Sequence, residues 1–360
     1  MRIAWIIYGG LDQVTGGYIY DRLVIERLRA RGDEVVVESL EPVPRSSALA
    51  GAALGRRLAR LRPEVVVGDE LCFREIAPAF AALPAGVARV LLVHYLSQWE
   101  LPAGPPRAAV ALAEGAAMRA SDAHLATSAT TAARLRREHG LARVDVAPPG
   151  ADRLPRLPRA TRGEGAPRLL FVGSWLPRKR LLALLAAFER VGDPRAELML
   201  LGDPGRDLTY AARVRAAIEG SLFLRERVII GGLVGDEALA AALAEADALV
   251  LASSFEGYGM VLTEAIHAGL PVVATRTGAV AEVVRDGEEA LICEGEGDLA
   301  TALGRFLGDA DLRARMGAAA EARAPGLPTW DGTADAVRAT ITRATRNRRG
   351  RRPRGREGGG

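Results

Sequence analysis

Short apolar runs alternate with longer amphipathic segments along most of the chain. Each run leads into a polar or glycine-containing turn, and then into apolar residues at three- and four-residue spacing. This alternation predicts parallel βαβ units, whose strands are covered by helices on both faces. The predicted strands are Ile3–Tyr8, Glu34–Glu38, Val65–Gly68, Val90–His94, Ala123–Thr127, Val144–Ala147, Leu169–Val172, Glu197–Leu201, Val228–Ile230, Ala248–Leu251, Pro271–Ala274 and Ala290–Cys293.

The strands fall into two sets on either side of a segment without periodicity. Pro148–Arg168 is rich in proline and glycine and is interpreted as a linker or surface excursion. A chain of 360 residues is also long for one domain. We therefore expect two Rossmann-like domains facing a cleft, which is the usual ligand site of such pairs. The expected boundaries are 1–160 and 161–325, then a helix over 326–342 that packs back on the first domain, and a tail over 343–360.

The charge of the chain is concentrated at its C-terminal end. The formal net charge is +4, but the segment from Arg343 onward carries eight arginines and one glutamate, or +7, so residues 1–342 carry 4 − 7 = −3. A slightly acidic body does not indicate nucleic-acid binding. The tail has almost no apolar residues and is predicted to be disordered. It is a solvated end, or a segment attracted to anionic headgroups at the inner face of a membrane or, as a weaker alternative, to RNA.

Other bulk features point to an ordinary enzyme of the cytoplasm. No run of about 18 apolar residues exists, and the apolar run that follows Met1 is too short for a signal peptide. Cys72 and Cys293 are far apart and form no metal-binding spacing, so we expect two unpaired thiols.

The stretch Ala248–Val284 carries the clearest chemistry. A predicted buried strand leads into a loop containing Glu256, Gly257 and Gly259, and then into a helix. Glycines permit positive φ and close approach of a ligand, and a helix N-terminus suits a diphosphate. Glu264 follows eight residues after Glu256, so the two carboxylates could accept hydrogen bonds from sugar and ribose hydroxyls. The structural alternative is a capping Glu256 and a solvent-facing Glu264 on a surface helix.

This stretch resembles the E-x7-E region of the retaining glycosyltransferases of family 4, which have the GT-B fold of two Rossmann-like domains. The similarity continues through Gly269–Ala274, Thr277–Glu282 and Val284–Gly287. The resemblance implies that Glu256 contacts hydroxyls of the donor sugar and that Glu264 contacts the ribose of the nucleotide. The loop amides that it assigns to sugar and phosphate are those of Gly257, Tyr258, Gly259 and Met260.

A second segment, Phe171–Phe188, resembles the strand, loop and helix that open the second domain of this family. Lys179 matches the family's lysine that contacts the donor diphosphate. Ser174 stands where the family commonly has an arginine, and Arg178 could supply the missing charge. Two cations near a leaving diphosphate would stabilise the negative charge that develops on it. The alternative is an exposed basic loop that caps a helix.

In the first half, the glycine loop Gly9–Gly17 follows the first strand and resembles the family's loop that approaches the donor phosphate. Gly16 and Gly17 are the residues assigned to this contact. His94, at the end of its predicted strand, matches a histidine that contacts the transferred sugar in many family members, although a structural histidine is the alternative. Gly202 matches a glycine of the family's nucleotide-side loop.

No metal site and no cofactor are predicted. Asp309 and Asp311 form a D-x-D string, but they start a late predicted helix and are interpreted as capping residues. Ser128 is likewise interpreted as an N-cap. Under the resemblance, cationic side chains and a helix N-terminus take the place of a divalent ion at the diphosphate.

The resulting prediction is a hexosyltransferase that retains anomeric configuration and uses a nucleotide-sugar donor, such as a UDP- or GDP-sugar. A sugar-nucleotide epimerase and a non-catalytic nucleotide-sugar-binding protein on the same scaffold remain alternatives. The sequence carries no signal for the acceptor, which could be a glycan, a lipid-linked intermediate or a small metabolite.

Overall fold

The chain forms two compact units of similar architecture. The computed structural model describes residues 1–41, 48–159 and 167–350. One unit comprises Met1–Pro148 together with the segment from Trp330 onward, and the other comprises Pro149–Thr329. Each unit contains a six-stranded sheet in which all neighbouring strands are parallel. All the predicted strands are present, most of them with ends shifted by one or two residues.

The sheet of the first unit has the order β2-β1-β3-β4-β5-β6. Its order reverses between β1 and β3, so the loops after these two strands start from adjacent strand ends. Its strands are β1 (Arg2–Tyr8), β2 (Glu34–Leu40), β3 (Val65–Asp69), β4 (Ala88–Val93), β5 (Ala123–Ala126) and β6 (Asp145–Val146). Its helices are α1 (Gly16–Ala30), α2 (Ala48–Arg60), α3 (Phe73–Ala81), α4 (Pro105–Ala120), α5 (Ala129–His139) and α14 (Trp330–Gly350), with short 3-10 turns η1 (Glu70–Cys72) and η2 (Ser97–Trp99).

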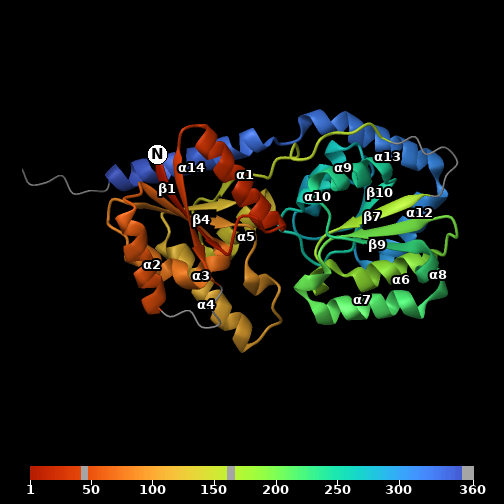
Figure 1. Ribbon diagram of the computed structural model, residues 1–360, viewed down its shortest axis with the longest axis horizontal. Coiled ribbons are helices and arrows are strands. Elements are labelled where there is room, and N and C mark those ends of the chain that lie inside the picture. The colour runs from red at the N-terminus through yellow and green to blue at the C-terminus, as the bar shows by residue number, and fades with distance from the viewer. Residues whose placement is uncertain (42–47, 160–166, 351–360) are drawn as a thin grey trace, which may run out of the picture. The chain divides into compact units, whose positions relative to one another are not determined.

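Helices cover both faces of this sheet. Figure 1 shows α1 and α14 on one side and α2, α3 and α4 on the other, and the packing of α1 on α14 and of α3 on both α2 and α4 agrees with this view. Because both faces are covered, β3 is buried along its whole length. Ser128 is the N-cap of α5, as predicted, and its side chain accepts a hydrogen bond from the Thr131 amide at 2.9 Å.

The sheet of the second unit has the order β12-β11-β10-β7-β8-β9, and its order reverses between β7 and β10. The strands are β7 (Arg168–Val172), β8 (Glu197–Leu201), β9 (Val228–Gly232), β10 (Ala248–Leu251), β11 (Val272–Thr275) and β12 (Ala290–Cys293). The helices are α6 (Leu181–Val191), α7 (Leu208–Gly220), α8 (Leu222–Arg227), α9 (Asp236–Glu245), α10 (Met260–His267), α11 (Val280–Val283), α12 (Glu296–Gly308) and α13 (Ala310–Arg323), with 3-10 turns η3 (Pro177–Lys179), η4 (Pro204–Arg206) and η5 (Ala324–Gly326).

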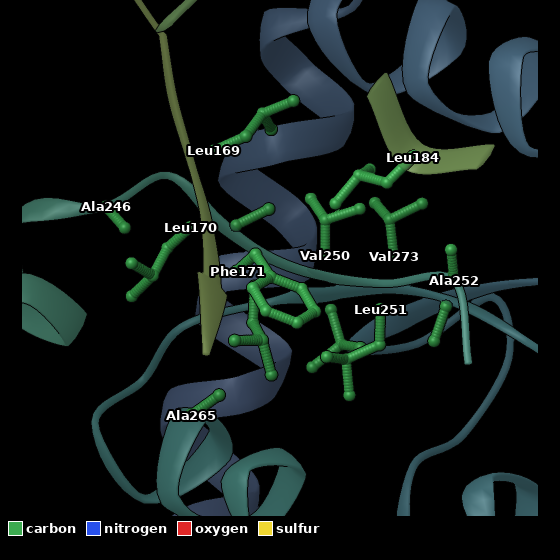
Figure 2. Packing of buried hydrophobic residues seen from close by; sticks show 14 of the residues in the cluster. Leu169, Leu170, Phe171, Leu184, Ala246, Val250, Leu251, Ala252, Ala265 and Val273 are labelled. Carbon is green, nitrogen blue, oxygen red and sulfur yellow. The ribbon is translucent and has the colours of Figure 1, made fainter. Parts of the chain in front are cut away.

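The core of the second unit lies around its two central strands. Figure 2 shows Phe171 of β7 among apolar side chains of β10, β11 and α10, including Val250, Leu251 and Ala265. These four side chains are fully or almost fully buried. Burial of this kind contributes roughly 1.5–3 kcal/mol per large apolar side chain. It holds the ends of β7 and β10 in place, and the loops that follow these strands start from that rigid base.

The irregular segment after Pro148 is, in its described part, a surface excursion of the second unit and not a free linker. The predicted linker is packed on the second unit along residues 149–159, where Leu154 joins the core and Arg159 donates hydrogen bonds to the carbonyls of Leu243 and Ala246 at 3.2 and 2.6 Å. Residues 160–166 lie outside the described residues. The unit boundary therefore falls at Pro148–Pro149, earlier than the expected 160–161.

The arginine-rich end is helical as far as Gly350. Residues 343–350, predicted to be disordered, continue α14, and residues 351–360 lie outside the described residues. Ile341 and Ala344 are buried at helical spacing. Arg343 pairs with Asp145 of β6, and Arg348 pairs with Asp122 at 2.9 Å. The composition of the segment could not indicate the ion pairs that order it, because the acidic partners lie some 200 residues away in the sequence.

Candidate functional site

The loops after β7 and β10 form one cluster at the point where the second sheet reverses its strand order. In open α/β sheets, ligands bind at the carboxyl ends of the strands at such a point. The loop after β7 contains Lys179 in η3, and the loop after β10 contains Glu256. The amide of Ser254 donates to the carbonyl of Arg178 at 2.8 Å, which ties the two loops together.

Lys179 and Glu256 form a buried ion pair. The Lys179 Nζ lies 2.6 Å from the Glu256 Oε1, and the Ser253 hydroxyl donates to the same oxygen at 2.5 Å. The exposed fractions of Lys179 and Glu256 are 9% and 4%. The structural alternatives are therefore wrong: Lys179 is not part of an exposed loop, and the Glu256 side chain is occupied by Lys179 and Ser253.

The electrostatics favour an ionised Glu256. Burial by itself would raise the pKa of this carboxyl, but the charges of Lys179 and Arg178 and the hydrogen bonds from Lys179 and Ser253 outweigh it, so the pKa is lowered. An ionised carboxylate beside an ammonium group is a strong acceptor for sugar hydroxyls. The same ammonium can face an anionic phosphate.

The loop between β11 and α11 supports Glu256 from behind. The Glu256 carbonyl accepts a hydrogen bond from the Ala279 amide at 3.0 Å. Thr275 and Thr277 donate their hydroxyls to the carbonyls of Ser253 and Ser254 at 2.7 and 2.6 Å. Gly278 has φ +49°, and a methyl group on it would overlap the backbone of Glu256. Only glycine fits this close approach.

The predicted amide cradle lies at the start of α10. Gly259 is its N-cap, in the left-handed conformation with φ +85°, and Met260 is the first helical residue. Gly257 and Tyr258 belong to the loop between Glu256 and this N-cap, and Tyr258 is buried. Amides at a helix start lack an intrahelical acceptor and can bind an anion, although in α10 the Leu262 amide already donates to the Gly259 carbonyl at 2.8 Å.

Glu264 is buried on α10 and paired with an arginine that we did not predict. The Arg153 Nη2 and Nε lie 2.8 and 2.9 Å from the Glu264 Oε1. Arg153 also contacts Asp236 at the start of α9. Burial raises the pKa of Glu264, although Arg153 opposes that effect. The alternative of a solvent-facing Glu264 is wrong, since its exposed fraction is 4%.

The remaining predicted residues of the second unit line the neighbouring strand ends. Ser174 lies between β7 and η3, in the loop that carries Arg178 and Lys179. Gly202 follows β8, and a side chain on it would overlap the backbone of Gly173. Gly202 thus permits the loops after β7 and β8 to touch. The charge of Arg178 acts on Glu256, as its contribution to the lowered Glu256 pKa shows.

In the first unit, the glycine loop and His94 lie together. Gly16 and Gly17 begin α1, and a Cβ on Gly17 would lie 3.4 Å from the His94 Cδ2. His94 is the first residue after β4, which ends at Val93, one residue before the predicted strand end. Its ring packs edge-on against Tyr20 at 5.1 Å, and Tyr20 packs in turn on Trp330 of α14. The returning helix therefore helps to position the imidazole.

Three buried acids surround His94, and none of them was predicted. Asp21 lies on α1, Asp69 ends β3, and Glu70 begins η1. The exposed fractions of these acids are 0%, 1% and 2%. The His94 Nε2 lies 3.8 Å from both the Asp21 Oδ1 and the Asp69 Oδ2, and the His94 amide donates to the Glu70 Oε2 at 2.9 Å.

The pKa values of His94 and of the three acids around it are shifted from their ordinary values. Burial raises the pKa of Asp21 to about 7. Burial and the charge of Asp21 likewise raise the pKa of Asp69, and burial and the charge of Asp69 raise that of Glu70. Burial lowers the pKa of His94, against the attraction of Asp69. Clustered perturbed groups of this kind are typical of functional sites.

Asp21→Asn should stabilise the protein at high pH. A carboxyl whose folded pKa is raised favours the folded state at low pH, and that stability is lost as pH rises through the folded value. The pH window runs from the ordinary pKa of an aspartate, 3.8, to the folded pKa of Asp21, about 7. Across this window the free energy of unfolding changes by roughly 4 kcal/mol at most. The measurement is urea unfolding of both proteins at pH 4 and pH 8. Asp69, Glu70, His94 and Tyr20 face Asp21, and the charge of Asp21 raises the pKa values of Asp69, Glu70 and Tyr20, so the difference reports Asp21 together with its coupling to these groups. Equal stability differences at the two pH values would contradict this prediction.

The same cluster bears on metal binding. Ligand atoms of Asp21, Asp69 and His94 lie within 4.8 Å of one another. Ligands that share a tetrahedral ion at about 2.1 Å lie about 3.4 Å apart, closer than the 3.8 Å between the imidazole and each carboxylate. A metal ion would therefore require the imidazole and the carboxylates to move closer together. Protons on the carboxyls neutralise the buried negative charge without such a movement. The second unit offers no comparable group among its described residues.

Two signals in the sequence could have identified more of the site. Lys179 is the only lysine in the 360-residue chain, which otherwise uses arginine throughout, so its position is distinctive. Asp69 and Glu70 directly follow a fully apolar run, at the place where parallel strands present functional side chains. No local signal marks Arg153, because it lies in the irregular segment after Pro149.

Comparison with known families shows what this chain is similar to. Residues 157–323 match the family model described as Glycosyl transferases group 1, and residues 20–153 match the model described as Glycosyltransferase Family 4. A D-inositol 3-phosphate glycosyltransferase of Streptomyces scabiei is 32% identical over 273 residues, which is 71% of this chain and 61% of the relative. One of Nocardia farcinica is 35% identical over 209 residues, which is 54% of this chain and 46% of the relative. The chain thus aligns with less than two thirds of the length of these relatives.

Solved structures show the same fold. A sucrose-phosphate synthase of Thermosynechococcus elongatus has a TM-score of 0.79 at 20% identity, covering 96% of this chain and 99% of that one. The Anabaena protein HepE, solved in complex with UDP-glucose, has a TM-score of 0.74 at 17% identity, covering 95% and 100%. These likenesses confirm the predicted fold class of two Rossmann-like sheets.

Proposed function

This chain belongs to the family 4 glycosyltransferases of the group 1 type, and we propose that it transfers a hexose-type sugar from a nucleotide-diphosphate donor to an acceptor. The observation that supports this proposal best is the buried Lys179–Glu256 pair. It places an ammonium group and a carboxylate beside the N-terminus of α10, in loops from two adjacent strands. An anionic leaving group and a polyhydroxyl sugar need these two kinds of partner next to each other.

In the proposed reaction, the chain supplies position and charge. Lys179, Arg178 and the amides of Gly259 and Met260 face the diphosphate, and Glu256 accepts hydrogen bonds from the sugar. The bond between the anomeric carbon and the phosphate oxygen breaks as a bond to the acceptor oxygen forms. The acceptor proton passes to the departing phosphate oxygen on the same face of the sugar, so configuration is retained. We expect activity without a divalent ion, because the cationic groups stabilise the leaving diphosphate.

The test is a turnover assay with a panel of UDP- and GDP-hexoses and of acceptors, in the presence of EDTA. Proton NMR of the product gives its anomeric configuration. An α-linked product from an α-linked donor supports the proposal, and a β-linked product contradicts retention. Release of an epimeric nucleotide sugar would favour an epimerase, and donor binding without any turnover would favour a non-catalytic binding protein.

Arg153→Ala should weaken nucleotide binding and leave turnover at saturating donor almost unchanged. Arg153 holds the buried Glu264 carboxylate at 2.8 Å, and we propose that this carboxylate accepts the ribose hydroxyls. Without its partner, Glu264 loses its orientation and part of its charge. We expect the Kd for the nucleotide, measured by calorimetry, to rise at least about tenfold.

Arg156→Ala is the matched control, because Arg156 lies three residues away and pairs with Glu321 instead. Its Kd should stay close to that of the unsubstituted protein. Equal affinities of the Arg153 and Arg156 variants would show that Arg153 has no role in nucleotide binding.

The acceptor is proposed only by class. The relatives named above are D-inositol 3-phosphate glycosyltransferases, so the panel should include inositol phosphates and other polyol phosphates beside lipid-linked and glycan acceptors. None of the described helices combines the length and the apolar character that spanning a bilayer requires. A peripheral contact with anionic lipid would have to use arginines beyond those that α14 already pairs with Asp122, Asp145 and Glu64.

A further inference from the structure

The imidazole of His94 has one nitrogen directed at two buried carboxyls. Nε2 is buried, lies 3.8 Å from the Asp21 Oδ1 and from the Asp69 Oδ2, and has no hydrogen-bond partner at normal geometry. The His94 side chain is 12% exposed, so its exposed surface belongs to other atoms of the side chain. Gly17 packs against the Cδ2–Nε2 edge of the ring.

The ionisable groups nearest to Nε2 are both acidic. Within the described parts of the chain, His94 is the only basic side chain within ion-pair distance of Asp21 or Asp69. The Asp69 Oδ1 is occupied by the Leu71 amide at 2.8 Å, which leaves Oδ2 turned to the imidazole. Neither oxygen of Asp21 accepts a hydrogen bond at normal geometry, although the Trp5 indole and the Asp69 carboxyl lie close enough to Asp21 to lower its pKa against the effect of burial. A lone pair on Nε2 would face these oxygens unfavourably, whereas an N–H there would be attracted to them.

We propose that Asp21 and Asp69 are positioning residues that hold His94 in the Nε2–H tautomer, so that Nδ1 presents a lone pair to a hydroxyl of the substrate. The part that concerns the substrate rests on the proposed transferase function, whereas the tautomer itself does not. The two carboxyls share one proton at neutral pH, and the remaining negative charge faces Nε2. The burial that raises the pKa of Asp21 to about 7 is consistent with such sharing.

The neighbouring groups make the arrangement rigid. The His94 amide is held by Glu70, and the ring is held by Tyr20, whose hydroxyl donates to the Ala147 carbonyl at 3.0 Å. The imidazole therefore cannot easily turn to exchange its two nitrogens. Its hydrogen-bonding role is then set by which nitrogen carries the proton, as in other enzymes where a carboxylate fixes a histidine tautomer.

The first arm of the test reads the tautomer directly. The chain has four histidines, so selective 15N-histidine labelling gives a simple spectrum, and His94→Gln identifies the His94 signals. At pH 8 without substrate, we expect the Nε2–H form for His94. Asp21→Asn combined with Asp69→Asn should abolish that preference, since an amide can donate to Nε2. Glu114→Gln is the matched control, because Glu114 is equally buried in the same unit but bonds to Ser97.

The second arm reads catalysis. In the double variant we expect kcat to fall at least about tenfold while the KM for the donor changes little, because the lost contact orients a reacting group. Glu114→Gln should change neither. An Nδ1–H form in the unsubstituted protein, or an unchanged tautomer in the double variant, overturns the proposal. Stoichiometric shifts of the His94 signals on adding Zn²⁺ or Mn²⁺ would also overturn it, by showing a metal site instead. Absence of transfer with every donor would overturn only the proposed function, because the spectra need no substrate.

Discussion

Lys179→Met should reduce kcat/KM for sugar transfer at least about 100-fold, the usual effect of removing one group that stabilises developing charge. Lys179 contributes the buried ammonium group of the loop cluster, 2.6 Å from Glu256. The measurement is the initial rate with the donor identified by screening. Arg180→Met is the matched control, because Arg180 is the next cation in the chain but is half-exposed and pairs with Glu296. A Lys179 variant within about twofold of the unsubstituted rate would contradict the diphosphate role.

The same substitution should also destabilise the fold, which must be separated from its effect on chemistry. Removing one partner of a buried ion pair typically costs about 3–5 kcal/mol, because the other charge is left uncompensated. Glu256→Gln added to Lys179→Met removes that charge. We expect the double variant to recover most of the unfolding free energy but none of the activity. Recovery of activity would show that Lys179 acts only through stability.

The chain offers a direct probe of Lys179. Apart from the N-terminal amine, it has no other primary amine, so reductive methylation with 13C-formaldehyde labels two groups. The amine of Met1 is held by Asp33 at 2.7 Å and provides an internal reference. Donor at about ten times its Kd should slow methylation of Lys179 about tenfold and leave Met1 unchanged. Equal rates at Lys179 with and without donor would place the diphosphate elsewhere.

Gly278→Ala should greatly weaken donor binding even though Gly278 carries no functional group. Its φ of +49° disfavours any side chain, and a Cβ on it would overlap the backbone of Glu256. A methyl group must push the Glu256 loop away from Ala279 and from Lys179. We expect the Kd for the nucleotide sugar to rise at least about 100-fold, measured by calorimetry.

Gly287→Ala is the control that separates backbone strain at a positive φ from overlap with the Glu256 backbone. Gly287 has φ +80°, but a methyl group on it meets no atom within 4 Å. It should lose roughly 1 kcal/mol of stability from backbone strain alone and bind donor normally. If both variants bound donor equally well, the close contact between Gly278 and the Glu256 backbone would have no functional importance.

Much of this protein could be predicted because its signals are local. The strands are short apolar runs between glycines, and all of them appear in the structure because burial on both faces requires such runs. Ser128 and Asp309 cap their helices as predicted, since an N-cap depends only on a neighbouring side chain and amides three residues on. Gly259 and Glu256 lie in one continuous motif, so spacing alone placed them in the same loop.

The errors concern segments whose order depends on distant partners. Residues 343–350 lack apolar composition, yet α14 continues through them because Asp145 and Asp122 accept their arginines. The first part of the predicted linker is ordered because Arg153 and Arg159 find their partners on α10 and around α9. Composition describes a segment by itself, and such contacts become visible only when both partners are placed.

The sequence by itself determined the two sheets, the family resemblance and the residues that carry it, because periodicity and motif spacing are properties of neighbouring residues. The tertiary structure decided the partners. It joined Lys179 to Glu256 across 77 positions and Arg153 to Glu264 across 111, and it surrounded His94 with Asp21 and Asp69 from separate elements. Buried charges are stable only beside a counter-charge or a proton, and the fold, not local spacing, chooses which one each of them meets.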